Sequence, residues 1–477
     1  MHEIIDANGE CGTMSLLVRP ELLFVDGAFL PKRAICVSDD GRVEAIVASD
    51  TASDSVIDLP GKALLPGFIN VHSHSFQRLI RGKAESRAVS GRDFWSWRGT
   101  MYHAAAHLDP QQVYDVARMA FLEMLMAGTT TVGEFHYLHT APDGRPYDDP
   151  NLLAKQVIAA AQSVGIRIVL LRCAYLRSGF ELPRDPGQTR FFETREAFLK
   201  NIDLLVRDTP ADDTVQVGVA PHSIRAVPLD DIRAIAAWAR QHRLPLHMHM
   251  AEQVAENEAC LREYGAPPVA LLGKAGLLGP DWTAIHAIHI TPGEIAMLAD
   301  AGATIGSCPT TERNLGDGIL AADSVQRSGI RIAFGSDSQA QIDPLEDARE
   351  LDYHLRLAHQ QRVMLDQIGE QGIASRLFDC ATRNGAQSLS VPAGRLEPGA
   401  PADFFTADLR DVSIAGHSAD DLLPMIVFGM NRTAIRDVAV KGRLIVRDGR
   451  HALSQEILSR YAEVHEKVWR NAAGSQR

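Results

Sequence analysis

The middle of this 477-residue chain repeats one pattern, an apolar run rich in β-branched residues followed by an amphipathic helical stretch. Eight such runs occur, at residues 63–72, 129–135, 166–175, 214–222, 244–250, 283–289, 303–308 and 330–338. Helical periodicity separates them, as in residues 110–127, 151–164, 229–242 and 292–301. Continuously apolar strands that alternate with helices indicate a parallel sheet covered on its outer face. Eight units in about 270 residues predict an α/β fold of the (β/α)8 barrel type, with a doubly wound open sheet as the alternative.

The two ends of the chain differ from this middle. Residues 16–65 contain short runs in which apolar and polar residues alternate, and Asp26-Gly27 is typical of a hairpin turn. The same alternation of apolar and polar residues occurs again in residues 392–452. We therefore predict a second, small β-sandwich domain formed from both chain ends, with the barrel spanning residues 66–391.

The terminal segments and the charge bear on location and partners. Residues 1–15 are expected to be a leader without regular structure, and residues 453–477 a C-terminal helix. The leader lacks the apolar core of a secretory signal, and no apolar run approaches the roughly 20 residues of a membrane helix. With 48 basic and 60 acidic side chains the net charge is −12, which disfavours nucleic acid and anionic membranes as partners. We expect a cytoplasmic protein that forms a homodimer.

Side chains that can bind metals or move protons gather at the ends of the predicted strands. They are His72 and His74 after the first strand, His247, His249 and Glu252 after the fifth, His286 in the sixth and Asp337 after the eighth. The carboxyl ends of all strands in a barrel meet on one face, where active sites are built. Burying several imidazoles and carboxylates together is costly unless they share a cation. The pattern therefore predicts a metal site at that face.

Each feature taken alone has an ordinary structural explanation. Two histidines one residue apart are often a surface pair, since alternation places both on one face of a strand. Only one of His247 and His249 needs to be a ligand, and the other is expected to pack inside the barrel. Asp337 alone could belong to a capped turn. It is the combination, with every member at a strand end, that favours a metal site.

The chain resembles the amidohydrolase superfamily in three motifs, PGFINVHSH, HMHMAE and GSDS. Members of that superfamily hydrolyse C–N bonds on a (β/α)8 barrel with one or two metals. Three longer stretches, HSHSFQR, GTTTVGEFHYLH and CPTTERNLGDGI, are similar to the formimidoylglutamate deiminase branch. Enzymes of that branch convert N-formimino-L-glutamate and water to N-formyl-L-glutamate and ammonia in histidine degradation.

The resemblance implies that His72, His74, His249 and Asp337 bind one divalent metal. Nitrogen and oxygen ligands of this kind suit zinc, with iron as the alternative. Residues 214–222 contain no lysine, which disfavours the two-metal arrangement of some relatives. Zinc lowers the pKa of a bound water to about 7, so the resemblance implies that a metal-bound hydroxide attacks the formimino carbon.

The resemblance also implies that Glu252, His286 and Asp337 move protons. Glu252 would transfer a proton to the substrate nitrogen, whereas His286 and Asp337 would take one from the attacking water in an order left open. His289 competes with His286 for this role, and the resemblance favours His286. Strand alternation does not settle the choice, since residues three apart face opposite sides of a strand.

A dicarboxylate substrate requires local cations in a protein of negative charge. Residues 75–98 contain six basic and two acidic side chains and are expected to overhang the catalytic mouth. Stacking on the indoles of Trp95 and Trp97 could hold Arg98 in place. Its guanidinium could then form two hydrogen bonds to a carboxylate. The resemblance adds His222 and Arg225 as carboxylate contacts and Gln77 and Tyr137 as contacts of the formimino group, while Arg313 is a weaker candidate.

Two other functions are compatible with part of this pattern. A related aminohydrolase acting on a neutral heterocycle, such as a guanine- or cytosine-type deaminase, would share the metal and the proton-transfer groups without needing the arginines. A non-catalytic scaffold is the third possibility, although scaffolds of this type typically lose metal ligands that are all present here. The sequence as a whole favours a metal-dependent deiminase acting on a small anionic dicarboxylate.

Overall fold

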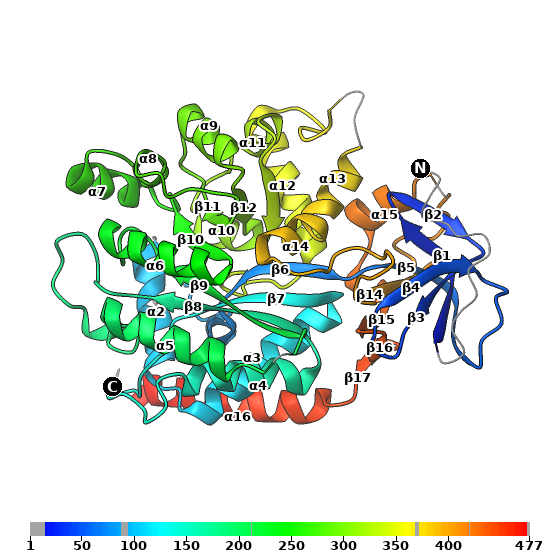
Figure 1. Cartoon of the computed structure of the whole chain (residues 1–477), viewed down its shortest axis with the longest axis horizontal. Helices are drawn as coiled ribbons and strands as arrows, with labels where there is room; N and C mark the ends of the chain where they lie inside the picture. Colours follow the sequence, from blue (N-terminus) through cyan, green and yellow to red (C-terminus); the bar gives the residue numbers. More distant parts are fainter. Residues whose placement is uncertain (1–14, 87–93, 211, 368–371, 419, 475–477) are drawn as a thin grey trace.

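The computed structural model describes residues 15–86, 94–210, 212–367, 372–418 and 420–474. The predicted leader lies outside these residues except for Ser15, and so do Arg87 and Arg92 of the basic stretch. Two units are visible in Figure 1, a barrel surrounded by helices and a β-sheet unit beside it.

Eight parallel strands form the barrel, in sequence order around it. They are β6 (Phe68–Ser73), β7 (Thr129–His136), β8 (Arg167–Ala174), β9 (Val215–Pro221), β10 (Leu246–Met250), β11 (Trp282–His286), β12 (Thr304–Ser307) and β13 (Arg331–Phe334). An isolated parallel bridge between Ser73 and Asp337 joins the first strand to the chain just beyond the last. The predicted barrel fold is therefore confirmed, and each strand falls within or close to its predicted run.

Helices cover the outside of the barrel, because the strands bury both faces and need an apolar cover. The main ones are α3 (Pro110–Met126), α4 (Leu152–Val164), α5 (Arg195–Asp208), α6 (Leu229–His242), α7 (Val254–Tyr264), α8 (Pro268–Lys274), α9 (Pro292–Ala301), α10 (Pro309–Leu315), α11 (Ala322–Arg327), α12 (Pro344–His359), α13 (Ile373–Cys380) and α14 (Arg383–Leu389). Asp109 and Gln112 form a capping box at the start of α3, which satisfies backbone donors there.

The β-sheet unit combines strands from both parts of the chain, as predicted. It contains β1 (Leu16–Val25), β2 (Ala28–Pro31), β3 (Arg33–Val37), β4 (Val43–Ala48), β5 (Ser55–Pro66), β14 (Phe404–Asp408), β15 (Ile435–Val440), β16 (Arg443–Arg447) and β17 (Arg450–His451). Hydrogen bonding runs through one nine-stranded mixed sheet, in which β14 pairs with β5 and so joins the two chain segments. The sheet has its own apolar cluster, which includes Val18, Ile35 and Phe404.

A buried ion pair and an aromatic contact join the sheet to the barrel. Arg167 in β8 is fully buried and donates from Nε to Asp403 Oδ2 at 3.0 Å. Phe68 in β6 packs on Phe405 in β14 with ring centroids 4.5 Å apart. Removing one member of a buried ion pair leaves an uncompensated charge, so this contact fixes how the two units pack.

The last helix, α16 (Ser454–Gly474), runs along the outside of the barrel and contacts α3. Trp469 Nε1 donates to the carbonyl of Leu79 at 3.1 Å, and Tyr461 donates its hydroxyl to the carbonyl of Arg78 at 3.0 Å. Both carbonyls belong to η1 (Ser75–Ile80), the short helix that follows β6. The end of the chain thus holds the segment that follows the first barrel strand.

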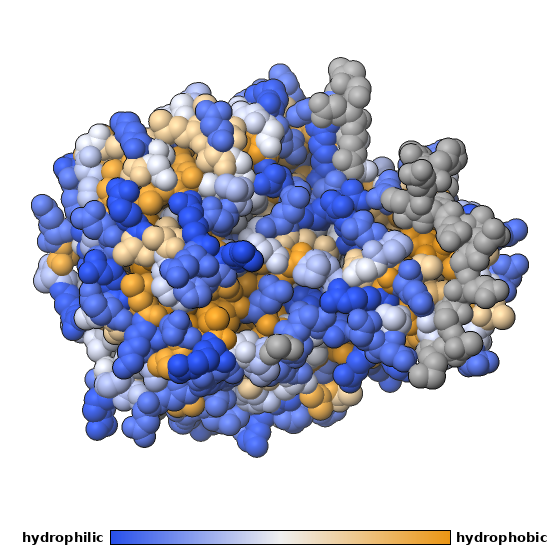
Figure 2. Space-filling model, viewed as in Figure 1, coloured by the Kyte–Doolittle hydropathy of each residue, from blue (hydrophilic) through white to orange (hydrophobic). Residues whose placement is uncertain are grey.

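Across the described ranges, no helix is both long and apolar enough to span a membrane. Large apolar side chains that reach the surface are scattered among polar ones, as the viewed face in Figure 2 illustrates.

Candidate metal centre and active site

Barrel closure brings the ends of β6 and β13 together. The backbone N–H of Asp337 donates to the carbonyl of His72 at 3.0 Å, and the N–H of His74 donates to the carbonyl of Asp337 at 3.0 Å. Asp337 and His286 have left-handed backbones, with φ of 42° and 70°. Such conformations cost about 1–3 kcal/mol for residues other than glycine and concentrate at functional sites. Here they turn the chain at the barrel mouth, where both side chains enter the site.

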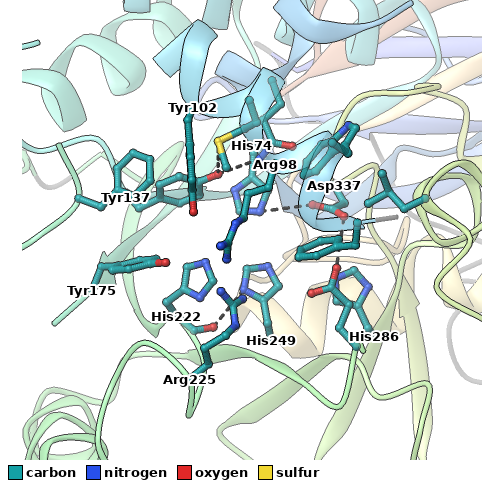
Figure 3. Close-up of a pocket in the computed structure, with 17 residues that line it drawn as sticks. His74, Arg98, Tyr102, Tyr137, Tyr175, His222, Arg225, His249, His286 and Asp337 are labelled. Atoms are coloured by element: carbon teal, nitrogen blue, oxygen red, sulfur yellow. Dashed lines mark hydrogen bonds and ion pairs between the residues drawn. The ribbon is translucent and has the colours of Figure 1, made fainter. Parts of the chain in front are cut away.

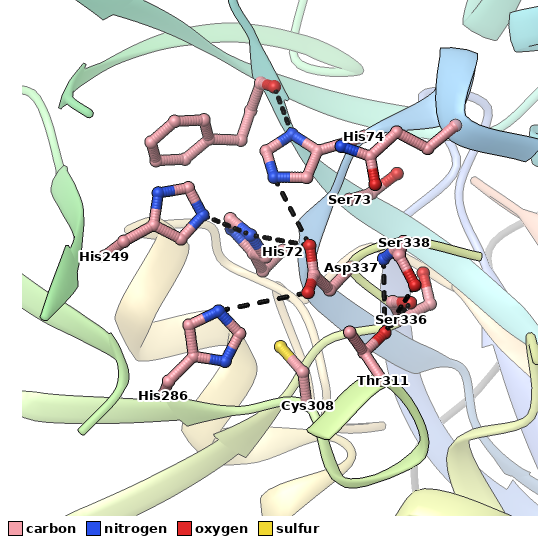
Figure 4. Close-up of polar contacts among 12 residues, drawn as sticks. His72, Ser73, His74, His249, His286, Cys308, Thr311, Ser336, Asp337 and Ser338 are labelled. Atoms are coloured by element: carbon pink, nitrogen blue, oxygen red, sulfur yellow. Dashed lines mark hydrogen bonds and ion pairs between the residues drawn. The ribbon is translucent and has the colours of Figure 1, made fainter. Parts of the chain in front are cut away.

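The four residues implied as metal ligands meet at this mouth (Figure 4). One ligand atom from each of His72, His74, His249 and Asp337 lies within 4.8 Å of the others. Asp337 Oδ1 is 3.4 Å from His72 Nε2 and 3.3 Å from His74 Nε2. The Nε2 atoms of His72 and His249 are 3.1 Å apart. All four side chains are buried, so three ring nitrogens and a carboxylate converge away from the protein surface.

Hydrogen bonds at the far side of two rings set their orientation. His74 Nδ1 donates to the carbonyl of Phe135 at 2.8 Å, and His249 Nδ1 donates to the carbonyl of His222 at 3.0 Å. A carbonyl only accepts, so each ring carries its proton on Nδ1 and turns an Nε2 lone pair toward the cluster. This is the usual support for metal-binding histidines.

The ionisation of the cluster also suits a cation. Burial lowers the pKa of His72 to about 3 and lowers the pKa values of His74 and His249 as well. Burial opposes ionisation of Asp337, but the hydrogen bond from His72 and the neighbouring histidine rings lower its pKa. Neutral imidazoles and an ionised carboxylate are the forms that bind metals. The donor set therefore fits a divalent cation.

His286 lies beside this cluster together with buried carboxylates. Its Nε2 is 3.9 Å from Glu252 Oε1 and 3.9 Å from Asp337 Oδ2, and its Nδ1 is 3.3 Å from Glu312 Oε1. Burial disfavours the charged ring, but the three carboxylates together raise the pKa of His286 to about 10. Burial raises the pKa of Glu252. A cationic ring next to a carboxyl group that is hard to ionise can serve in proton transfer.

Glu312 was not among the predicted site residues. It lies in the first turn of α10, accepts from the backbone N–H of Cys308 at 2.8 Å and contacts the far nitrogen of His286. Its position in the CPTTERNLGDGI motif is the signal that could have found it. Between the two histidines that competed in the sequence, the structure places His286 at the site, whereas His289 donates to the carbonyl of Asp317 at 2.8 Å.

A cavity lies above the cluster (Figure 3). Its lining includes every predicted catalytic and substrate-binding residue: Gln77, Arg98, Tyr137, His222, Arg225, Glu252, His286 and Asp337. Unpredicted lining residues are mostly aromatic: Phe94, Trp97, Tyr102, Tyr175 and Phe191. Figure 3 shows the guanidinium groups of Arg98 and Arg225 approaching one region of the cavity from opposite sides.

The predicted contacts come from separate elements. Gln77 lies in η1, and Tyr137 directly follows β7. Gln77 Nε2 donates to the hydroxyl of Tyr137 at 2.7 Å. His222 and Arg225 follow β9, and Arg225 is 8% exposed. Arg98 belongs to α2 (Phe94–Ala106) and lies over the ring of Tyr102, with 5.3 Å from the guanidinium carbon to the ring centroid.

Several basic residues do not reach the cavity, which corrects the expectation drawn from charge counting. Arg78 and Arg81 pair with Glu123 of α3 at 2.9 and 2.8 Å. Lys83 lies over the ring of Trp469. Arg313, the weaker candidate, forms an ion pair with Glu350 at 2.5 Å outside the cavity. Side chains of neighbouring helices contact these basic groups. A count of charges along the sequence does not reveal such partners. His247 donates from Nε2 to the carbonyl of Ser388 at 3.0 Å.

Comparisons with known proteins agree with this architecture. The amidohydrolase family model matches residues 63–445. A formimidoylglutamate deiminase from Pseudomonas aeruginosa is 37% identical over 93% of this chain and 98% of its own length. An 8-oxoguanine deaminase from the same species is 30% identical over 87% of this chain and 89% of its own length. The crystal structure of an amidohydrolase from Brucella melitensis shares 33% identity and a TM-score of 0.87, covering 95% of this chain and 99% of its own. The predicted family is thus confirmed: the chain belongs to the amidohydrolase family of hydrolases.

Proposed function

We propose that this protein hydrolyses N-formimino-L-glutamate to N-formyl-L-glutamate and ammonia with one divalent metal, zinc in preference to iron. The observation that carries the proposal is one cavity that joins the histidine–aspartate cluster to two arginines, Arg98 and Arg225. The 37% identity to a formimidoylglutamate deiminase supports the same substrate. Such a reaction belongs to the breakdown of histidine.

The metal would be held by His72, His74, His249 and Asp337. When bound there, a divalent cation lowers the pKa of water and supplies a nucleophile at neutral pH. The three nitrogens and one carboxylate oxygen match the ligands that zinc prefers.

The residues around the cluster would handle the protons of the reaction. Water adds to the formimino carbon, the bond from that carbon to the terminal nitrogen breaks, and a formyl oxygen and ammonia result. Asp337 accepts the proton of the attacking water, and the cationic ring of His286, whose Nε2 lies 3.9 Å from Asp337 Oδ2, polarises that water. Glu252, whose Oε1 lies 3.9 Å from the same His286 Nε2, transfers a proton to the departing nitrogen. A well-placed acid or base contributes about 10²–10⁴-fold to the rate.

The remaining polar residues would select a dicarboxylate. Arg98, His222 and Arg225 offer donors to its two carboxylates, and a charge-assisted hydrogen bond contributes about 1.5–3 kcal/mol. The amide of Gln77 and the hydroxyl of Tyr137, bonded to each other at 2.7 Å, would face the formimino group.

An ammonia-release assay tests this proposal. Purified protein loaded with zinc is given N-formimino-L-glutamate beside a panel of purines and pyrimidines, and the product is identified by mass spectrometry. We expect rapid release of ammonia from the formimino substrate with N-formyl-L-glutamate as product. Free glutamate as product, or turnover confined to the panel, would overturn the proposal.

A second candidate is an aminohydrolase acting on a neutral heterocycle. The 30% identity to an 8-oxoguanine deaminase favours it, and the metal cluster would serve either reaction. The two arginines that line the cavity favour the diacid, because a guanidinium forms charge-assisted hydrogen bonds to a carboxylate and a neutral ring offers none.

A further inference from the structure

The loop after β8 forms a small socket that takes no part in the reaction proposed above. This socket consists of Asp185, Gly187 and Gln188, around the one-turn helix η2 (Pro186–Gln188). It contacts α2, the helix that carries Arg98. Gln188 is fully buried, which is unusual for a polar side chain on a loop.

The socket holds the ring of Tyr102. A Cβ atom at position 187 would lie 2.7 Å from Tyr102 Cδ2, so only glycine leaves room for the ring. The backbone around it is fixed, because Asp185 accepts from the N–H of Gly187 at 2.9 Å and its carbonyl accepts from the N–H of Gln188 at 3.0 Å. The fit between loop and ring therefore restricts where the phenol can point.

A hydrogen bond sets the direction of the Tyr102 hydroxyl. Gln188 Nε2 donates to the Tyr102 oxygen at 2.6 Å. Since an amide N–H cannot accept, the hydroxyl is left to use its own hydrogen elsewhere. Burial raises the pKa of Tyr102, which keeps that hydrogen in place at neutral pH. Tyr102 lines the cavity and its hydroxyl points into it, on the side where Arg98 and Arg225 converge (Figure 3).

We propose that Tyr102 binds a carboxylate of the substrate beside Arg98 and that the socket is the positioning element that keeps its hydroxyl a donor. This proposal rests on the proposed function, since it names a further residue that selects the diacid. The guanidinium of Arg98 stacks over the same ring, so one carboxylate can meet a cation and a neutral donor together. Neutral donors add directionality that a charge alone lacks.

Removing the hydroxyl is the first test. Tyr102→Phe keeps the ring in its socket, and we expect KM for N-formimino-L-glutamate to rise about tenfold or more while kcat changes less than about twofold. Tyr114→Phe, which removes a phenol from α3 outside the cavity lining, is the matched control and is expected to leave KM unchanged. A Tyr102→Phe enzyme with unchanged KM, or with a loss confined to kcat, would overturn the proposal.

Two monoacid analogues identify the contacted group. N-formimino-norvaline lacks the distal carboxylate, and N-formimino-4-aminobutyrate lacks the carboxylate next to the nitrogen. We expect Tyr102→Phe to raise KM for one analogue and to leave the other unaffected, because only one retains the group that Tyr102 binds. An equal increase for both would indicate general damage to the cavity and would contradict the assignment.

The positioning role of Gln188 has its own readout. Gln188→Met removes the donor at similar size and should raise KM for the diacid about threefold, whereas Gln188→Glu should raise it more because a carboxylate would take the hydroxyl hydrogen for itself. In a Tyr102→Phe background, neither change should raise KM further. Additive effects would show that Gln188 does not act through the hydroxyl.

Binding separates this inference from the proposed function. Calorimetry with glutarate and with N-formyl-L-glutamate measures dicarboxylate affinity without turnover. Weaker binding to Tyr102→Phe by about tenfold supports the role of Tyr102 even if the formimino substrate is not hydrolysed. Equal affinity of both proteins for both dicarboxylates would overturn the inference, whatever the activity.

Discussion

The histidine–aspartate cluster and the proposed carboxylate-binding side of the cavity are built in different ways. The cluster comes from strand ends that are linked by backbone hydrogen bonds, such as those between His72, His74 and Asp337. The carboxylate side comes from helices and loops, with Arg98 on α2 and Tyr102 held by η2. Barrel closure positions the first region almost by itself, whereas the second depends on packing between segments far apart in the chain. Changes in the first should therefore abolish chemistry, and changes in the second should shift affinity.

The largest effect is expected from removing a metal ligand. His249→Ala deletes one of the three ring nitrogens, and loss of a cation that lowers the pKa of water should reduce kcat/KM by more than about 10⁴-fold. Metal content measured by plasma mass spectrometry should fall together with the activity. His247→Gln, on the same strand but outside the cluster, is the control and should retain the metal. Full metal content in the His249→Ala protein would argue against this ligand set.

The next effect concerns proton transfer without loss of the metal. Glu252→Gln keeps the size and hydrogen-bonding capacity of the side chain but cannot deliver a proton, so kcat should fall about 10²–10⁴-fold. Bound metal and KM should stay close to those of the wild type. Glu258→Gln, on the exposed face of α7, should behave as the wild type does. A kcat within tenfold of the wild type would exclude Glu252 from the proton transfer.

A smaller and different effect is expected on the carboxylate side. Arg225→Met removes a buried guanidinium, and KM for the diacid should rise about 10- to 100-fold while metal content is unchanged. Arg313→Met removes an arginine that pairs with Glu350 outside the cavity and serves as the control. Steady-state kinetics on N-formimino-L-glutamate gives both numbers. If the wild-type enzyme turned over neutral heterocycles faster than N-formimino-L-glutamate, this side of the cavity would not be a carboxylate-binding region, and the comparison of the two regions would fail.

The smallest effect tests whether packing at a distance supports the carboxylate side. Trp469 in α16 donates to the carbonyl of Leu79 and stacks on His103 of α2 with ring centroids 5.2 Å apart. Trp469→Ala should therefore loosen η1 and α2 and raise KM about two- to fivefold, since each lost contact contributes roughly 1 kcal/mol. Hydrogen exchange should increase in residues 75–80 and 94–106, with Leu458→Ala on the exposed face of α16 as control. Unchanged exchange there would contradict a supporting role.

The same division explains what could be predicted from the sequence. Strand periodicity and the position of polar residues at strand ends were sufficient to predict the barrel. The family motifs then indicated which residues form the cluster. Charge counting over residues 75–98 was a weaker guide, because Arg78 and Arg81 pair with Glu123 of a helix that packs against them. The sequence of residues 75–98 alone does not indicate partners that lie far away in the chain.

Residues that act through another side chain were the hardest to find. Glu312 reaches His286 only because α10 starts at the end of β12, and Gln188 reaches Tyr102 across 86 residues of sequence. Neither residue stands in a periodic pattern. Alternation along a strand also could not separate His286, which lines the cavity, from His289, which bonds to the carbonyl of Asp317.

The central claim is that one cation joins His72, His74, His249 and Asp337, and anomalous diffraction from crystals of the zinc-loaded protein tests it most directly. The account predicts a single strong peak about 2.0–2.2 Å from the three Nε2 atoms and from a carboxylate oxygen of Asp337. A peak at the neighbouring group of His286, Cys308 and Glu312, or two peaks in the barrel mouth, would contradict it.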